Sequence, residues 1–383
     1  MPSTAAARST SGPQPPAPPS ASLAAFDALV PGDPAPGWLR DGVAASWRFG
    51  PAAGGDVTMR LITVSENATF LVSVDGAPAA VVRVARPGYL AGADAFESEV
   101  AWVAALATDG VCQVPAALRT GDGTFCAALA DEAGTDWWCV AYGYVAGRIL
   151  EDLFADAEPG TGAADPTSYY REIGAINARL HEHALQWAAP EGFARHSWDV
   201  PDMLGPTARW GRWEDAVDGA ERELLERAQA AALAIVGQAP RDPAAWGLVH
   251  ADLRPSNIMI SSAGPGQAGP GQVEAELTVI DFDDCGHTWF QYDFAAALSF
   301  LEHTPEVPTM ALEWLAGYTS VRPLSRDAVE LGCALSMVRR LQMLGWTTTH
   351  RADALPPDLW AAQVPGTLAV AESYLRSPTW LLD

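Results

Sequence analysis

Two short stretches in the second half of the chain decide its fold. They read Leu248-Val-His-Ala-Asp-Leu-Arg-Pro-Ser-Asn-Ile-Met-Ile260 and Val279-Ile-Asp-Phe-Asp-Asp284. Asp252 and Asn257 stand five residues apart on a loop that leads into an apolar run, and Asp281 follows the next apolar run. If the two runs pair as neighbouring strands, these three side chains converge in one cleft.

A repeated low-complexity segment separates the two apolar runs. Residues 263–267 and 268–272 both read Ala-Gly-Pro-Gly-Gln. Glycine and proline at this density indicate a loop, so the runs 257–260 and 277–280 are predicted to form a hairpin with an expanded connection.

The residue types in the two stretches suit magnesium-dependent phosphoryl transfer. Carboxylate and amide oxygens are hard ligands for Mg²⁺, which binds few protein groups and completes its shell with phosphate and water. The reaction also needs a carboxylate that accepts the proton of the attacking hydroxyl. Asp252 or Asp281 alone is more typical of an acidic turn, but the ordered set across a hairpin favours the catalytic interpretation.

Composition and charge limit the kinds of partner that the chain can have. Its 383 residues, 49% hydrophobic and 18% charged, are enough for two lobes with buried cores. The net charge is −24, which disfavours a nucleic-acid partner and favours cationic or metal-bridged ligands. All 23 basic residues are arginine, which excludes lysine-based catalysis.

The cysteines and the hydropathy indicate a cytoplasmic protein. The five cysteines are scattered and never spaced as CxxC, so we expect reduced thiols rather than disulfides or a zinc site. No apolar run is long enough to span a membrane, and the N-terminus lacks the apolar core of a signal peptide. We therefore expect no membrane partner.

The hydrophobic periodicity changes along the chain. Strand-like runs are predicted at 57–64, 69–74, 79–84, 124–129 and 138–144, with one helix at 93–106. Helical spacing dominates later, at 169–185, 220–236, 308–318, 325–344 and 366–375. This order predicts an α+β fold with a small β-rich N-terminal lobe and a larger helical C-terminal lobe.

The chain resembles the aminoglycoside phosphotransferase family of the protein-kinase-like superfamily, which is related to homoserine kinases, choline kinases and bacterial stress-response kinases. The two decisive stretches carry the resemblance. Softer motifs extend it over residues 57–346, namely Ser65-Glu-Asn-Ala-Thr-Phe70, Val81-Val-Arg-Val-Ala-Arg-Pro-Gly-Tyr89, Glu97-Ser-Glu-Val-Ala-Trp102, Tyr144-Val-Ala-Gly-Arg148, Ala178-Arg-Leu-His181, Tyr292-Asp-Phe-Ala295 and Arg339-Arg-Leu-Gln-Met-Leu344.

The resemblance implies a two-lobed kinase-like architecture with the active site between the lobes. Residues 1–22, rich in Pro, Ala, Ser and Thr, are predicted to be a disordered tail. Residues 23–142 would form the nucleotide-binding lobe, and residues 143–383 the catalytic and acceptor-binding lobe.

The resemblance also implies roles for the residues of the two decisive stretches. Asp252 would be the catalytic base, and Asn257 and Asp281 the ligands of Mg²⁺. His250 would brace the loop, and Asp293 would tie the helical lobe to it.

Further residues are implied to bind ATP. The turn that contains Ser65 and Asn67 would cover the nucleotide phosphates, although it lacks the Gly-rich pattern of protein kinases. An ordinary hairpin turn is an equally good interpretation of it. Tyr142 and Tyr144 stand where the lobes should join, so the backbone there would contact the adenine edge.

Arg83 is the main departure from the family pattern. The family usually places a lysine at this strand position, paired with a glutamate of the first helix, here Glu99 or, as a second choice, Glu97. The arginine indicates either a degraded nucleotide site or a chain that uses arginine wherever a permanent cation is needed. Because Asp252, Asn257 and Asp281 are all present, we favour an active enzyme.

Four remaining polar residues have weaker predictions. Asp283 and Asp284 could orient a second metal ion or a cationic substrate, or could merely accept hydrogen bonds from the backbone. His181 and His183 are two residues apart on a helix, which is wrong for a shared metal, so we expect both on the surface.

The predicted function is ATP- and Mg²⁺-dependent transfer of the γ-phosphoryl group to the hydroxyl of a small molecule. The acceptor would be aminoglycoside-like, an amino alcohol or homoserine-like, and the acidic charge favours a cationic one. Two alternatives stay open: a serine/threonine protein kinase of the bacterial stress-response type, and a non-catalytic nucleotide-sensing pseudokinase.

Overall fold

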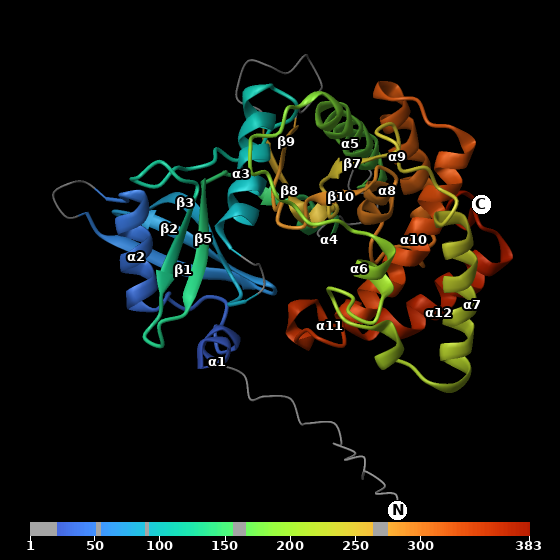
Figure 1. The fold of residues 1–383 in the computed structure, drawn as a ribbon, viewed down its shortest axis with the longest axis horizontal. Helices are drawn as coiled ribbons and strands as arrows, with labels where there is room; N and C mark the ends of the chain where they lie inside the picture. The colour runs from blue at the N-terminus through green and yellow to red at the C-terminus, as the bar shows by residue number, and fades with distance from the viewer. Residues whose placement is uncertain (1–20, 51–54, 89–91, 156–165, 263–274) are drawn as a thin grey trace, which may run out of the picture.

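The chain folds into a β-rich N-terminal lobe and a helical C-terminal lobe (Figure 1). A computed structural model describes residues 21–50, 55–88, 92–155, 166–262 and 275–383. The strands are β1 (Val57–Val64), β2 (Asn67–Val74), β3 (Ala77–Ala85), β4 (Cys126–Ala130), β5 (Asp136–Gly143), β6 (Arg148–Ile149), β7 (Trp246–Val249), β8 (Ile258–Ser262), β9 (Ala275–Val279) and β10 (Gly286–Trp289).

The helices lie mostly in the second lobe. They are α1 (Ala21–Asp27), α2 (Gly37–Trp47), α3 (Ala93–Thr108), α4 (Leu150–Ala155), α5 (Tyr169–Gln186), α6 (Val200–Leu204), α7 (Gly219–Val236), α8 (Tyr292–Ala297), α9 (Val307–Val321), α10 (Arg326–Trp346), α11 (Pro357–Ala361) and α12 (Gln363–Arg376). The predicted α+β, two-lobed fold is therefore confirmed.

The N-terminal lobe is built on one antiparallel sheet in the order β1-β2-β3-β5-β4. Asp75 and Gly76, with φ of 51° and 81°, form the β2–β3 turn, and this pair of positive φ values matches the twist of a tight hairpin. Alternate residues such as Phe70, Val72 and Val82 are fully buried, which gives this lobe its own core.

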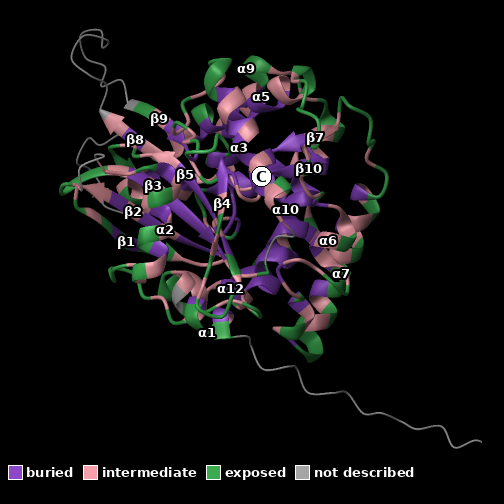
Figure 2. Cartoon of the chain, turned by 60° about the vertical axis from the view of Figure 1, so that its left-hand side comes forward, coloured by how far each residue is buried: buried purple, intermediate pink, exposed green. Residues whose placement is uncertain are grey.

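The C-terminal lobe is organised around α10. Every residue of this helix from Leu331 to Trp346 is buried, so it runs through the middle of the lobe with α7, α8 and α12 packed against it. Figure 2 shows buried residues concentrated in the sheet and around α10, with exposed residues on outer helices such as α9. The predicted hairpin is present as antiparallel β8 and β9, and its Ala-Gly-Pro-Gly-Gln loop lies outside the described residues.

The two lobes meet at α3 and at the start of the chain. Figure 1 shows α3 between the sheet and the helical lobe. At α1, the Arg351 guanidinium donates to the backbone carbonyl of Asp27, the last residue of that helix, at 2.7 Å. The predicted tail lies outside the described residues except for its last two, Ala21 and Ser22, which begin α1.

Two further expectations concern thiols and membranes. All five cysteines lie within the described ranges and are unpaired. Over those same ranges, every helix is too short or too polar to cross a lipid bilayer.

The stability of the fold should depend on pH through His196, which follows α5. Burial, together with the charges of Arg195 and Arg209, lowers the pKa of His196 to about 2. The unfolded chain protonates this imidazole near pH 6.5, so below that pH it binds a proton that the folded chain does not. We expect the free energy of unfolding to fall by up to about 1.4 kcal/mol per pH unit on this account.

Urea unfolding of the wild type and of His196→Gln at pH 7.5 and 5.5 measures this contribution. The variant should lose less stability than the wild type on acidification. Equal losses in the two proteins would contradict the assignment.

Candidate active site

The loop after β7 has a backbone conformation that is held in place by Asp293. The Asp293 carboxylate is fully buried and accepts hydrogen bonds from the backbone N–H groups of His250 (3.3 Å) and Ala251 (2.8 Å). Ala251 has a φ of 68°, a left-handed conformation that is unfavourable for alanine. The two hydrogen bonds stabilise this conformation and so fix where the next residue, Asp252, projects.

The carboxylate of Asp293 also contacts a buried histidine, His181. His181 Nε2 lies 2.9 Å from the Asp293 carboxylate, and its Nδ1 lies 2.9 Å from the hydroxyl of Tyr318. Burial lowers the pKa of His181 in spite of the nearby carboxylate. The prediction that His181 lies on the surface is therefore wrong, because its two polar partners allow the ring to be fully buried.

Asp252 and Asn257 converge as their spacing predicts. The Asn257 amide Nδ2 donates to the Asp252 carboxylate oxygen Oδ2 at 2.7 Å and to the Asp252 backbone carbonyl at 2.8 Å. The other carboxylate oxygen, Oδ1, is paired with Arg339 of α10. His250 lies behind the loop, with Nε2 3.2 Å from the carbonyl of Ile280 and Nδ1 accepting from the backbone of Asp252.

Asp281 follows β9, and its carboxylate lies near enough to Asp252 for the two charges to repel. Its φ of 63° is again left-handed, and its carboxylate is 45% exposed. Arg83 Nη1 lies 3.6 Å from Asp281 Oδ1, so the strand β3 of one lobe and the acidic turn of the other meet here. Strained backbone of this kind is common at functional sites.

The residues present suit a metal ion held mainly by the substrate. Among the described residues, no group of three His, Cys, Asp or Glu side chains is arranged to hold a metal ion. Mg²⁺ in kinases needs only one or two protein ligands, because phosphate and water supply the rest. Since Asn257 turns its amide nitrogen toward Asp252, its oxygen Oδ1 is left available to a metal ion, as is the carboxylate of Asp281, whose side chain is 45% exposed.

Arg83 forms the predicted ion pair with Glu99 of α3. Arg83 Nη2 lies 2.5 Å from Glu99 Oε2, and the hydroxyl of Tyr142 donates to Glu99 Oε1 at 2.9 Å. Although burial opposes its charge, the carboxylate of Glu99 raises the pKa of Arg83 well above its usual range. Glu97, the second choice, instead accepts hydrogen bonds from the backbone of Phe125 and Cys126.

Arg195 joins this ion pair from the helical lobe. Its fully buried guanidinium lies 3.8 Å from Glu99 and donates to the backbone carbonyls of Ala95, Asp283 and Cys285. It thereby ties α3 to the acidic turn. No motif in the sequence indicated this residue.

The β1–β2 turn contacts the helical lobe through two side chains, those of Glu66 and Asn67. Asn67 Nδ2 donates to the Asp283 carboxylate at 2.5 Å. Glu66 accepts a hydrogen bond from the indole N–H of Trp346 and lies 2.8 Å from His350 Nε2. Burial opposes ionisation of Glu66, but the hydrogen bond and charge of His350 lower its pKa below the usual value. We call the contact of Asn67 with Asp283, together with the contacts of Glu66 with Trp346 and His350, the turn fastenings.

The other residues predicted to bind nucleotide are Ser65, Tyr142 and Tyr144, and several of their polar groups already have hydrogen-bond partners within the protein. The backbone N–H of Ser65 donates to the carbonyl of Asn67 within the turn. Tyr144 is 43% exposed, and the backbone amides of Gly143 and Tyr144 already donate to Ala116 and Ala79. Those two amides are therefore not free to donate to an adenine edge, and the Tyr142 side chain is committed to Glu99.

Asp284 differs from its neighbour Asp283. Within the part of the chain that the structure describes, its carboxylate accepts no hydrogen bond. Burial and repulsion by Asp252 and Glu66 raise the pKa of Asp284 well above its usual range. A cation placed among these carboxylates would offset the repulsion.

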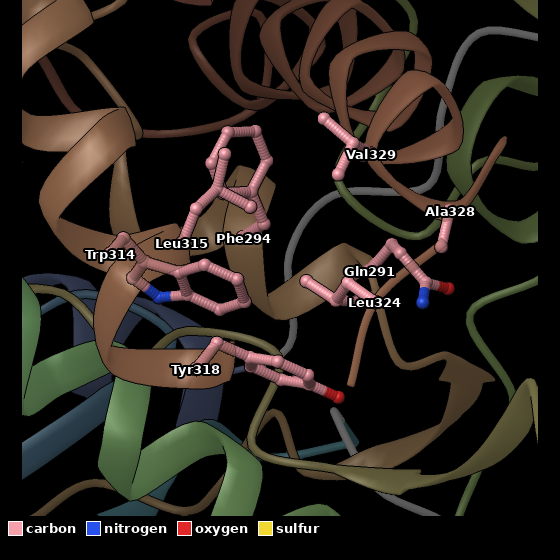
Figure 3. Close-up of a pocket in the computed structure, with 9 residues that line it drawn as sticks. Gln291, Phe294, Trp314, Leu315, Tyr318, Leu324, Ala328 and Val329 are labelled. Atoms are coloured by element: carbon pink, nitrogen blue, oxygen red, sulfur yellow. The ribbon is translucent and has the colours of Figure 1, made fainter. Parts of the chain in front are cut away.

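A separate small pocket lies between α8, α9 and α10 (Figure 3). Phe294, Trp314, Leu315 and Leu324 make its wall mostly apolar, and Tyr318 contributes one hydroxyl. None of the residues predicted to act in catalysis or to bind metal or nucleotide lines this pocket, and it offers no charged group for a phosphate.

Comparison with known proteins agrees with this geometry. Residues 59–329 match the model of the phosphotransferase enzyme family, the APH family. The chain belongs to this family. It is thus a kinase-type phosphotransferase, as the sequence predicted.

A curated relative and several solved structures are similar to this phosphotransferase. The homoserine kinase of Chelativorans sp. (strain BNC1) is 30% identical over 192 residues, which cover 48% of this chain and only 52% of that protein. A microcompartment-associated aminopropanol kinase is 35% identical, with a TM-score of 0.72 over 86% of this chain and 95% of its own. An amicoumacin kinase solved with AMP-PNP and Ca²⁺ has a TM-score of 0.65 at 18% identity over 87% and 92%, which shows a shared fold.

Substitution of Glu66 tests whether the turn fastenings contribute to ATP binding. Glu66→Gln keeps an oxygen for Trp346 but removes the charge that faces His350. Because a charge-assisted hydrogen bond is stronger than a neutral one by about 1 kcal/mol, we expect KM for ATP to rise about fivefold with little change in kcat.

His350→Gln is the matched control, since it removes the other half of the same pair. Steady-state kinetics of both single variants and the double variant should show that the second substitution adds little. Fully additive effects would show that Glu66 and His350 do not act together.

Proposed function

We propose that this phosphotransferase transfers the γ-phosphoryl group of ATP, with Mg²⁺, to the hydroxyl of a small amino alcohol. The observation that carries the proposal is the 35% identity to an aminopropanol kinase over 86% of the chain. The cleft geometry supports it, because Asp252, Asn257 and Asp281 lie together where the lobes meet.

In this proposal, Asp252 orients the acceptor hydroxyl and accepts its proton. One carboxylate oxygen is held by Arg339 and the other by Asn257, so the carboxylate is fixed before the acceptor binds. Bound Mg²⁺ would neutralise charge on the phosphates, with Asn257 and Asp281 as its protein ligands. Such a reaction depends on positioning and electrostatics rather than on covalent chemistry by the protein.

Arg83 would contact the nucleotide phosphates in place of the family's lysine. Its Nη2 is committed to Glu99, while Nη1 points toward Asp281, where the metal-bound phosphates would lie. Arginine keeps a permanent charge and can bind phosphate oxygens with two N–H groups. This geometry favours an active enzyme over a degraded nucleotide sensor.

The charge of the cleft supports an acceptor that carries an ammonium group. Among the described residues, the carboxylate of Asp284 accepts no hydrogen bond, and it lies close to Asp252 and Glu66. The basic groups nearby face the other two carboxylates: Arg339 and Arg254 lie beside Asp252, with Arg254 Nε at 3.7 Å, and His350 lies beside Glu66. An amino alcohol could place its ammonium beside Asp284 and its hydroxyl beside Asp252. A neutral alcohol would leave the repulsion uncompensated.

The proposal is tested by Mg²⁺-dependent ATP consumption with a panel of acceptors. The panel contains short amino alcohols, the same alcohols without the amine, homoserine, aminoglycosides and a generic protein. We expect turnover with short amino alcohols, and a loss of at least about 10²-fold in kcat for Asp252→Asn with ATP binding retained. Phosphate transfer to protein alone, or full activity of the variant, would refute it.

Asp284→Asn tests how the ammonium group is recognised. Removing one charge-assisted contact should raise KM for an amino alcohol about tenfold or more. The same alcohol without the amine is the control, and its KM should change little. A changed Mg²⁺ requirement with equal effects on both substrates would instead assign Asp284 to a second metal ion.

A further inference from the structure

Two consecutive arginines of α10 are buried but serve different partners. Arg339 and Arg340 are 1% and 0% exposed, and a buried guanidinium needs acceptors for its N–H groups. Arg340 lies 3.0 Å from the carboxylate of Glu302 and donates to Thr367, and both of these partners are buried. Arg339 points the other way, toward Asp252.

Arg339 makes contacts that lock its orientation. Besides the Asp252 carboxylate, it donates to the backbone carbonyl of Ala251 (2.8 Å), the hydroxyl of Tyr292 (2.9 Å) and the hydroxyl of Ser299 (2.7 Å). The guanidinium carbon also lies 5.3 Å from the centre of the Tyr292 ring. The planar fork of arginine matches these separate acceptors, whereas an ammonium could not span them.

The contact with Ala251 gives Arg339 a second effect on the loop. Ala251 is left-handed, with its N–H bonded to Asp293 and its carbonyl bonded to Arg339. The peptide groups on both sides of this residue are therefore fixed by buried charged groups. Rotation about Ala251 would move Asp252 directly.

We propose that Arg339 is a positioning residue for phosphoryl transfer, which sets the orientation of Asp252 without binding nucleotide or acceptor itself. This inference rests on the proposed function, since it takes Asp252 as the base. Catalysis of phosphoryl transfer depends mainly on the placement of groups around a loose transition state, so the orientation of the base matters for the rate. A displacement of about 1 Å at such a group can cost on the order of 10²-fold in rate.

Arg339→Lys and Arg340→Lys, compared side by side, test the inference. Both substitutions keep the charge and disturb a buried fork, so a purely structural role predicts similar effects. We expect Arg339→Lys to lower kcat between about 10- and 100-fold, with KM and binding of an ATP analogue within about twofold of wild type. Arg340→Lys should lower the melting temperature but leave kcat of the folded protein within about twofold.

A double variant separates this inference from the proposed function. In the Asp252→Asn background, Arg339→Lys should produce no further loss of the residual rate. Equal kcat for the two lysine variants, or a loss confined to KM for ATP, would overturn the positioning role. A wild-type chain without acceptor-dependent turnover would overturn the proposed function instead.

Ser299→Ala keeps the test available if Arg339→Lys does not fold. It removes one acceptor of Arg339 and leaves the guanidinium in place. We expect a partial loss of kcat with ATP-analogue binding unchanged. Wild-type kcat in a folded Ser299→Ala protein would count against the role of the Arg339 contacts.

Discussion

The carboxylate of Asp293 is the constraint on which the rest of the site depends. It receives two successive backbone N–H groups and the ring of His181, all buried. Without these hydrogen bonds, Ala251 would leave its left-handed conformation, which costs on the order of 1–2 kcal/mol. The direction of Asp252 follows from this anchored turn, and the contacts of Arg339 with Ala251 and Asp252 depend on it.

Because the chain contains no lysine, its buried permanent cations are all arginine side chains. A guanidinium cannot lose its proton, so each buried arginine keeps its charge and needs several acceptors. Arg83, Arg195 and Arg339 meet this demand in three ways: with a glutamate, with backbone carbonyls, and with the aspartate of the active site. Arginine in the family's lysine position is thus part of a pattern that extends through the cleft.

The sequence predicted the fold well because helices and strands leave periodic patterns, and β1 was predicted with its observed bounds. It also predicted the convergence of Asp252 and Asn257, which are close in sequence. It could not predict the roles of Glu66 and Arg339, because the contacts of Glu66 with Trp346 and of Arg339 with Asp252 each join residues more than 80 positions apart. His181 was misplaced for the same reason, because only its distant partners make burial of the ring acceptable.

The turn fastenings have a kinetic consequence. Glu66 and Asn67 hold the strand turn of one lobe to the other lobe at two points. If the nucleotide lies beneath that turn, as the proposed function requires, it leaves only when the contacts at both points are broken. Opening of this kind sets the residence time of the spent nucleotide and, with it, a ceiling on turnover. A tighter closure would retain the substrate longer but would release ADP more slowly, and these two side chains set that balance.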